Sequence, residues 1–414
     1  MSHPHPAGPL AGMPAGALEG VRVVEICSTF AGPACARLLA DFGADVIKLE
    51  PREGDPVRQL GDFADGVSLQ GVSLMRGKRI IALDLKHPEG RAIAHDLIRK
   101  ADILVENNRP GVMERLGFGY EELSRDNPGL VMVRISGYGQ DGPNAQRPGY
   151  GAICEAFGGV RYLTGDPDRP PSRVALATTD YLTAVYAAFG AMMALFVRQR
   201  TGKGQVVDAA LYETAFSMME GLVPAYQKLG KVPFRNGPNL QAFAPNSLYP
   251  TADDSYVLIA ANNKATYERL VAVMRQPHML TDPRFATLRA RAENMAAVDA
   301  EVTNWTRQHT GAGLEAMLNE AGVPVARVYS MADIFRDPHY KARDMLLDVP
   351  HPVLGTTVQT GIVPKLSATP GRVRHAGHET GADTEAILRD ELGYDAARVA
   401  ALLADGAVGA LAGG

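Results

Sequence analysis

The fold class is decided by Val21-Arg-Val-Val-Glu-Ile26 and, one residue later, Ser28-Thr-Phe-Ala-Gly-Pro-Ala-Cys-Ala-Arg-Leu-Leu-Ala-Asp-Phe-Gly-Ala-Asp-Val-Ile-Lys-Leu-Glu50. Val21–Ile26 is apolar and predicts a buried strand. Pro33–Phe42 predicts a short helix, and Asp45–Glu50 predicts a second strand. Since a strand, a helix and a strand follow one another closely, this segment is typical of a parallel sheet.

The same alternation continues along the next ninety residues. Further strands are expected at Arg79–Leu85, Asp102–Asn107 and Leu130–Ser136. Three helices are expected between them. The first begins at Pro88, because proline suits a first helical turn, and the other two span Pro110–Leu116 and Tyr120–Arg125. Strands that alternate with helices imply a parallel sheet covered on both faces, so we predict a Rossmann-like α/β domain.

The length of 414 residues exceeds one ordinary hydrophobic core and favours two domains. Composition shifts to Pro, Gly and Asn around 229–250, and the turn Asp253-Asp254-Ser255 precedes a strand at Tyr256–Ala261. Helices are expected near 265–276, 294–308 and 311–321, and Val323–Tyr329 is expected to start the return to the first domain. We therefore predict a flexible tail at 1–17, a large domain at 18–228, a small α+β domain at 229–325, and completion of the large domain at 326–414.

Bulk properties narrow the possible partners and compartment. A net charge of −4 gives no reason to expect nucleic acid. The three cysteines are odd in number and lack metal-like spacing, which favours a reduced, cytoplasmic setting. The first seventeen residues lack the pattern of a secretory signal. The apolar run Leu182–Val197 is shorter than a membrane span of roughly 20 residues, so we predict a buried core helix and no membrane partner.

Three motifs are decoys. Gly137-Tyr-Gly-Gln-Asp-Gly142 matches a dinucleotide fingerprint, but prolines at 143 and 148 predict a loop where such a fingerprint opens a helix. Gly202-Lys-Gly204 lacks the earlier glycine of a phosphate loop and reads as a turn. His375 and His378 lack a third ligand at metalloenzyme spacing, so we expect a solvated loop and no metal site.

Asp180 stands at the front of an uncharged run, Tyr181 to Val197, and has two interpretations. An aspartate just before an apolar helix is a good N-cap, because its carboxylate accepts hydrogen bonds from the first-turn amides. The residue type and position alone favour that capping role. A carboxylate kept ionised at a helix start can also act as a nucleophile, so the two roles are compatible.

Several tracts, in order, carry a family resemblance. They are Asp180-Tyr-Leu-Thr-Ala-Val-Tyr-Ala-Ala-Phe-Gly-Ala-Met-Met-Ala-Leu195, the tract Arg76–Gly90, the tract Ala101–Gly117, Ser136-Gly-Tyr-Gly and Arg147-Pro-Gly-Tyr150. Together with Ser28–Glu50 they resemble the CaiB/BaiF family, the class III coenzyme A transferases, from about residue 18 to the C-terminus. The resemblance implies that Asp180 is the acyl-carrying nucleophile and that relatives form interlocked dimers, so a homodimer is expected.

Position by position, the resemblance also implies a coenzyme A site. Arg52 is the replacement for an arginine that formyl-CoA transferases carry where this chain has Pro51. Arg and Lys at strand ends and loops suit a nucleotide phosphate. No permanently bound cofactor is expected, since acyl-CoA and a small carboxylic acid are substrates. The implied contacts are Phe30, Ala31, Arg52, Leu83, Lys86, Asn107, Asn108, Arg109, Arg115, Arg147 and Tyr150.

The acyl groups are suggested by Gly158-Gly-Val-Arg-Tyr-Leu-Thr-Gly-Asp-Pro-Asp-Arg-Pro-Pro171, which looks like relatives that move CoA between succinate and another dicarboxylic acid. Two alternatives stay open. One is an alpha-methylacyl-CoA racemase of the same family, although Gly149–Cys154 lacks the histidine found in the matching tract of racemases. The other is a non-catalytic acyl-CoA-binding protein, which would not need the Asp180 carboxylate.

Overall fold

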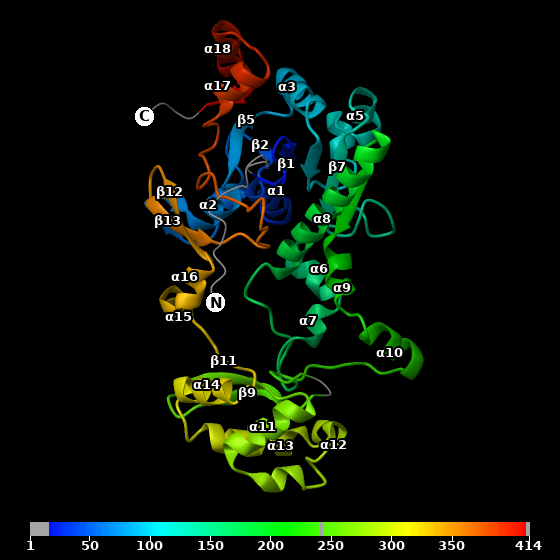
Figure 1. The fold of residues 1–414 in the computed structure, drawn as a ribbon. Helices are drawn as coiled ribbons and strands as arrows, with labels where there is room; N and C mark the ends of the chain where they lie inside the picture. The colour runs from blue at the N-terminus through cyan, green and yellow to red at the C-terminus, as the bar shows by residue number, and fades with distance from the viewer. Residues whose placement is uncertain (1–15, 241–242, 411–414) are drawn as a thin grey trace. The chain divides into compact units, whose positions relative to one another are not determined.

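A computed structural model describes residues 16–240 and 243–410, and it divides into two compact units (Figure 1). The first unit comprises the described residues up to Val160, Val174–Val223, and the described residues from His339 onward. The second comprises Arg161–Arg173 and Pro224–Pro338, so it begins before 229 and ends after 325. The tail expected at 1–17 lies almost entirely outside the described residues.

The first unit is built on a seven-stranded sheet of order β14-β5-β2-β1-β6-β7-β8. All neighbouring strands pair in parallel except the edge strand β14, which is antiparallel to β5. The predicted parallel α/β sheet is thus confirmed. The strands are β1 (Arg22–Ile26), β2 (Asp45–Glu50), β5 (Lys78–Leu83), β6 (Ile103–Glu106), β7 (Val131–Ser136), β8 (Val206–Ala210) and β14 (Val408–Gly409).

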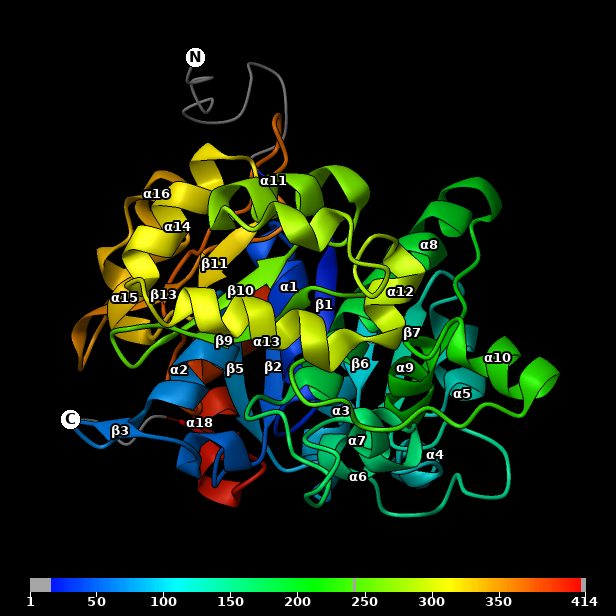
Figure 2. The ribbon, with the colours of Figure 1, turned by 90° about the horizontal axis from the view of Figure 1, so that it is seen from below.

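Helices cover both faces of this sheet (Figures 1 and 2). They enclose two separate apolar clusters. Helices α1 and α8 belong to the cluster on one face, and α3, α5 and α18 to the cluster on the other. Two short hairpins, β3 (Phe63–Ala64) with β4 (Val67–Ser68) and β12 (Leu346–His351) with β13 (Gly355–Thr360), complete the unit. Its helices are α1 (Ala31–Asp41), α2 (Leu69–Met75), α3 (Pro88–Arg99), α4 (Val112–Leu116), α5 (Tyr120–Asp126), α6 (Gly151–Phe157), α8 (Thr178–Thr201), α9 (Leu211–Ser217), α17 (Thr384–Ala386) and α18 (Ala396–Asp405).

Helix α8 is longer than the sequence indicated and is apolar on two sides. Its buried side carries a stripe of small residues, Ala184, Ala187, Ala191 and Ala194, in the same core cluster as α1 and β7. By length and composition alone α8 could cross a membrane, and 44% of its most apolar 18-residue window is buried. A core helix passes the same test, and the alanine stripe of α8 is buried in the core of the first unit.

The second unit has a three-stranded antiparallel sheet of order β11-β10-β9 packed against helices. The hairpin turn expected at Asp253–Ser255 is confirmed, because β9 (Asn246–Pro250) and β10 (Tyr256–Ala260) pair on either side of it. The expectation that Val323–Tyr329 returns to the first unit is wrong, because β11 (Val325–Arg327) pairs with β10. The helices are α11 (Lys264–Met274), α12 (Leu288–Glu293), α13 (Met295–Thr306), α14 (Gly311–Glu320) and α15 (Met331–Arg336), with α7 (Val160–Leu163), α10 (Leu222–Leu229) and α16 (Pro338–Ala342) at the boundaries.

Candidate active site

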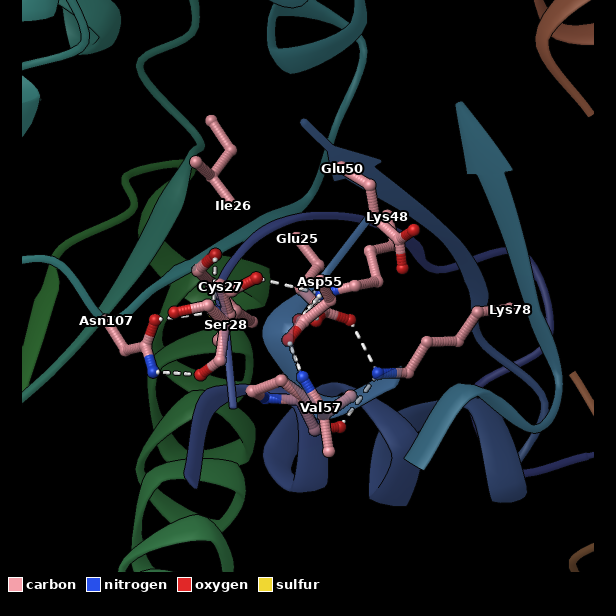
Figure 3. A network of polar contacts seen from close by, with 12 residues as sticks. Glu25, Ile26, Cys27, Ser28, Lys48, Glu50, Asp55, Val57, Lys78 and Asn107 are labelled. Atoms are coloured by element: carbon pink, nitrogen blue, oxygen red, sulfur yellow. Dashed lines mark hydrogen bonds and ion pairs between the residues drawn. The ribbon is translucent and has the colours of Figure 1, made fainter. Parts of the chain in front are cut away.

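The candidate site lies at the carboxyl edge of the parallel sheet, where β1 and β6 are neighbours. From β1 the chain proceeds outward to β2 and β5, and from β6 it proceeds the other way to β7 and β8. Such a reversal leaves a crevice outside the strand ends in which ligands of α/β proteins bind. Asn107, which follows β6, spans this point: its side chain accepts the Ser28 N–H at 2.9 Å and donates to the Ser28 carbonyl at 2.8 Å (Figure 3).

The turn between β1 and α1 carries two of the predicted coenzyme A contacts. Phe30 is the N-cap residue of α1 and Ala31 is its first residue. Thr29, just before them, has a φ of 71°, a left-handed conformation that is unfavourable for a β-branched residue. Strained backbone of this kind persists only where its surroundings hold it, and it is concentrated at functional sites.

Asp180 lies inside helix α8, not in front of it. The N-cap residue is Ala177, so Asp180 is in the first turn and its predicted role as N-cap is wrong. A first-turn carboxylate still interacts favourably with the positive end of the helix. Asp180 is half-buried, and its carboxylate lies against Gly151 at the start of α6, where an added Cβ would come within 1.9 Å of Oδ2.

The direction of α8 places Asp180 at the same edge of the sheet as the β1–α1 turn. At the far end of the helix, Arg198 donates to the Gly129 carbonyl at 3.2 Å and pairs with Asp102 at 2.8 Å. Gly129 and Asp102 precede β7 and β6, so α8 ends at the amino edge. Its first turn therefore lies at the carboxyl edge, next to the loop after β7 that leads to Tyr150 and Gly151.

A buried thiol lies near the Asp180 carboxylate. Cys154, one turn into α6, is fully buried and its thiol donates to the Gly137 carbonyl. Burial, and then the nearby Asp180 charge, raise the pKa of Cys154 to about 11. Cys154 is therefore a neutral thiol at pH 7, which leaves Asp180 as the nucleophile candidate of this pair.

The other predicted contacts are spread along the carboxyl edge of the first unit. Arg52 follows β2, Lys86 follows β5 and Arg109 follows β6, and all three are exposed. Arg147 stacks over the Tyr138 ring at 5.3 Å, and Tyr150 is 71% exposed. Residues at the ends of four different strands are thus brought to one edge of the sheet, and their contact with coenzyme A stays a prediction.

Two predicted contacts are less accessible than the sequence suggested. Leu83 is 2% exposed and belongs to the core cluster between the sheet and α3. Ala31 is 4% exposed and belongs to the cluster on the opposite face. Arg115 is exposed on α4, one turn after Gly111.

Asn108 is held by an ion-pair network at the end of β6. Its N–H donates to Glu106 at 2.7 Å, and Arg134 donates to the other oxygen of Glu106 at 2.8 Å. Burial raises the pKa of Glu106, although Arg134 opposes that effect. Arg134 also pairs with Glu114 at 2.7 Å. Strands β6 and β7 and helix α4 are thus linked beside the crevice between the ends of β1 and β6.

Sequence reasoning missed a cluster of four buried charges next to the β1–α1 turn: Glu25, Lys48, Asp55 and Lys78 (Figure 3). Their side chains are at most 1% exposed. The available signal was a charged residue inside each of two mostly apolar strands, Glu25 in β1 and Lys48 in β2, whereas Lys78 is the first residue of β5 and lies just before the strand expected there. Such residues are almost never fully buried unless they are paired, so their positions indicated a network.

The HxxH pair is not solvated as expected. The rings of His375 and His378 stack 4.0 Å apart, and His378 pairs with Asp383 at 2.7 Å. His378 also lines a hollow of about 80 Å³ together with Arg58, His351 and Glu379. Within residues 16–240 and 243–410, no group of three or more His, Cys, Asp or Glu side chains could hold a metal ion.

Comparison with known proteins places this site in context. The family model described as CoA-transferase family III matches residues 18–384. The chain is 45% identical over 378 residues to a succinyl-CoA–D-citramalate CoA-transferase of Chloroflexus aurantiacus, covering 91% of this chain and 94% of that protein. It is 39% identical over 381 residues to the beta subunit of a succinyl-CoA–L-malate CoA-transferase of the same organism, with coverage of 91% and 94%.

The structural comparison agrees. The crystal structure of a CaiB/BaiF family protein from Brucella suis superposes with a TM-score of 0.81 at 34% identity, covering 91% of this chain and 99% of that one. Fold and sequence together define an α/β enzyme that acts on coenzyme A thioesters. The chain belongs to CoA-transferase family III, and its activity is that of a CoA-transferase.

Proposed function

We propose that the protein transfers coenzyme A from succinyl-CoA to a small dicarboxylic acid, with Asp180 as the covalent nucleophile. The observation that carries this proposal is the Asp180 carboxylate packed against Gly151 at the carboxyl edge of the sheet. The choice of acyl groups is supported by two relatives whose names specify succinyl-CoA as donor and citramalate or malate as acceptor.

The first half of the reaction moves coenzyme A onto the enzyme. A carboxylate oxygen of Asp180 attacks the thioester carbon of succinyl-CoA, the C–S bond breaks, and CoA leaves as a thiolate. The resulting mixed anhydride joins Asp180 to the succinyl group. The thiolate then attacks Asp180 Cγ, the anhydride C–O bond breaks, and succinate leaves, so Asp180 now carries CoA as a thioester.

The second half repeats these steps in reverse order with the acceptor. Its carboxylate attacks Asp180 Cγ and displaces the CoA thiolate, which gives a new mixed anhydride. The thiolate attacks the acceptor's carbonyl carbon, which releases the new acyl-CoA and regenerates the Asp180 carboxylate. Each intermediate is itself an anhydride or a thioester, and both are reactive acyl donors, so the cycle is reversible. No net proton or electron is needed.

Coenzyme A would be held along the carboxyl edge. We assign the diphosphate and ribose phosphate to the exposed cations Arg52, Lys86, Arg109, Arg115 and Arg147, which suit phosphate oxygens. The turn at Phe30 and Ala31, with Asn107 and Asn108 beside it, would contact the chain that leads to the thioester. Leu83, being buried, would contribute through its place at the end of β5, and Tyr150 through its neighbour Gly151 beside Asp180.

We further propose that the protein is a cytoplasmic homodimer. The outer face of α8 exposes four large apolar side chains at helical spacing, Val185, Phe189, Met193 and Phe196, each at least 50% exposed. A contiguous apolar face of this kind is typical of an interface. The family resemblance favours a second copy of this chain as its occupant and an interlocked arrangement of the two.

The test is mass spectrometry of the protein incubated with succinyl-CoA and a panel of dicarboxylic acids, quenched with hydroxylamine or borohydride. We expect a modified Asp180 peptide, new acyl-CoA products with one or more acceptors, and neither in Asp180→Ala. An absent adduct and absent exchange, with deuterium incorporated from D₂O into a 2-methylacyl-CoA, would instead assign the racemase reaction. Binding of acyl-CoA without either reaction would assign the binding-protein alternative.

A further inference from the structure

We propose that the buried Lys48–Asp55 ion pair is a positioning device: it fixes the backbone of the β1–α1 turn in the conformation that receives acyl-CoA. This inference rests on the proposed placement of acyl-CoA against Phe30 and Ala31. Neither Lys48 nor Asp55 needs to touch the substrate, so both are positioning residues.

The pair contacts the turn directly. Lys48 Nζ donates to the Cys27 carbonyl at 2.8 Å (Figure 3). Asp55 Oδ1 accepts the Thr29 N–H at 3.0 Å. Lys48 Nζ and Asp55 Oδ2 are 2.8 Å apart. A closed ring of contacts therefore links the two side chains to two main-chain groups that flank Ser28.

A second lysine, Lys78, contacts the other end of the β1–α1 turn. Lys78 Nζ donates to the Pro33 carbonyl in the first turn of α1 at 2.8 Å and to Glu25 Oε2 at 2.6 Å. Glu25 Oε1 accepts from Lys48 Nζ at 2.8 Å. One carboxylate thus joins both lysines, and the lysines bracket the turn from Cys27 to Pro33.

The strand register explains why these charges meet. Glu25 of β1 is the direct partner of Lys48 of β2, and Val46 of β2 is the partner of Lys78 of β5. Side chains alternate between the faces of a strand, so Lys48 shares a face with Val46, and therefore with Glu25 and Lys78. That face is covered by α1, and the charges lie between the sheet and the start of the helix.

The charges are matched, which makes a structural role possible in a dry environment. Two carboxylates and two ammonium groups give the cluster no net charge. Burial alone would lower the pKa of Lys48, but Glu25 and Asp55 hold it above its ordinary value. Lys78 has a single carboxylate partner and a cationic neighbour in Lys48, and burial lowers its pKa. Burial alone would raise the pKa of Asp55, yet Lys48 and the amides of Val57 and Thr29 bring it below its ordinary value.

The strain at Thr29 shows what the network holds in place. A threonine at φ 71° would relax to an extended or helical conformation if its N–H partner were lost. Relaxation would rotate the peptide planes on either side of Thr29, and Phe30 and Ala31 follow at once. An acyl-CoA bound at this turn would then meet misplaced main-chain groups.

The experiment compares two isosteric substitutions in the full-length enzyme. Asp55→Asn keeps the side-chain shape, but one amide oxygen cannot serve both Lys48 and the Thr29 N–H. The matched control is Asp41→Asn, which breaks a similarly buried pair with Arg76, 2.6 Å apart, at the opposite end of α1. For each variant we would measure Tm, kcat, KM for succinyl-CoA and the Kd of free CoA.

Both substitutions should lower Tm, and only Asp55→Asn should raise KM for succinyl-CoA and Kd for CoA, by about tenfold or more. Adding Thr29→Gly to Asp55→Asn should recover part of that loss, because glycine adopts positive φ without strain. The proposal would be overturned if Asp55→Asn and Asp41→Asn lowered Tm equally and Asp55→Asn left KM and Kd unchanged. Asp180→Ala tests the nucleophile separately. If Asp180→Ala abolishes transfer while Asp55→Asn leaves KM and Kd unchanged, the positioning role is refuted and the proposed function stands.

If Asp55→Asn does not fold, the double variant Lys48→Met/Asp55→Asn replaces it. Removing both charges leaves Glu25 paired with Lys78, so no buried charge lacks a partner, and such neutral replacements often preserve stability. The double variant loses the Lys48 contact with the turn and should show the same rise in KM. A folded double variant with the KM of the unaltered enzyme would contradict the proposal equally.

Discussion

Gly151 has no room for a side chain because the Asp180 carboxylate occupies that space: a Cβ there would lie 1.9 Å from Asp180 Oδ2 and 2.7 Å from Cγ. The first residue of α6 and the first turn of α8 are thus fitted to each other. The sequence shows only a glycine after Tyr150, and its reason lies in the position of the candidate nucleophile.

Gly151→Ala should therefore displace the Asp180 carboxylate. We expect kcat to fall by about 10²-fold, because a shift of roughly 1 Å in a reacting group has that effect, while the protein stays folded. Steady-state kinetics and trapping of the Asp180 adduct check this. Gly221→Ala is the control, since a Cβ at Gly221 meets nothing within 4 Å. An unchanged kcat in Gly151→Ala would show that Asp180 can move without loss.

Asp180→Asn separates catalysis from stability. The amide keeps the shape of the side chain but is not a nucleophile, so the transfer rate should fall by at least ~10⁴-fold. The free energy of unfolding should fall by no more than about 1 kcal/mol, the usual value of a first-turn carboxylate. Urea denaturation beside the kinetic assay measures both. A large loss of stability would make Asp180 chiefly structural.

Gly190 permits the close approach of α8 to β8. A Cβ at Gly190 would lie 2.6 Å from Val207 Cγ1, so Gly190→Ala should lower the free energy of unfolding by about 1–3 kcal/mol. Val207→Ala removes the colliding methyl groups, and the double variant should recover most of that loss. Thermal denaturation of the two single variants and the double variant measures the coupling, and strictly additive losses would contradict this contact.

His375 should make stability fall in mildly acidic solution. Burial and the neighbouring His378 lower the pKa of His375 from 6.5 to about 4. His375 therefore binds a proton more tightly in the unfolded chain than in the folded one. The contribution of neutral His375 to the free energy of unfolding is fully present above pH 6.5 and is lost as pH falls toward 4. Its size is on the order of 1 kcal/mol after allowance for partial exposure. His375→Gln should flatten this part of the pH profile in urea titrations, and an unaltered slope would assign it to other groups.

Phe189→Asp should test the proposed dimer without touching the site. Phe189 is 59% exposed in the middle of the outer face of α8, and a carboxylate there would oppose burial against a second copy. Light scattering after size-exclusion chromatography should show a dimer before the substitution and a monomer after it. Lys203→Glu, just beyond the end of α8, is the control. A dimer that survives Phe189→Asp would place the interface elsewhere.

Local patterns were enough to predict strands β1, β2, β5, β6 and β7 of the first unit. The strand Asp45–Glu50 has the expected bounds, and the prolines at 143 and 148 correctly indicated a loop, since α6 begins only at Gly151. Asp180 was singled out by family resemblance and by its place before an apolar run. Its exact place in the helix was wrong, because the helix begins two residues earlier with Thr178, without a side-chain cap.

The sequence by itself determined the parallel α/β class and the family, and it indicated the candidate nucleophile, because each depends on short segments read in order. Only the tertiary structure decided that Glu25, Lys48, Asp55 and Lys78 form one cluster, and that Gly151 makes room for Asp180. The contacts of Glu25 with Lys48 and Lys78 join residues 23 and 53 positions apart. Contacts over such distances depend on strand register and helix packing, which hydrophobic periodicity along a segment does not specify.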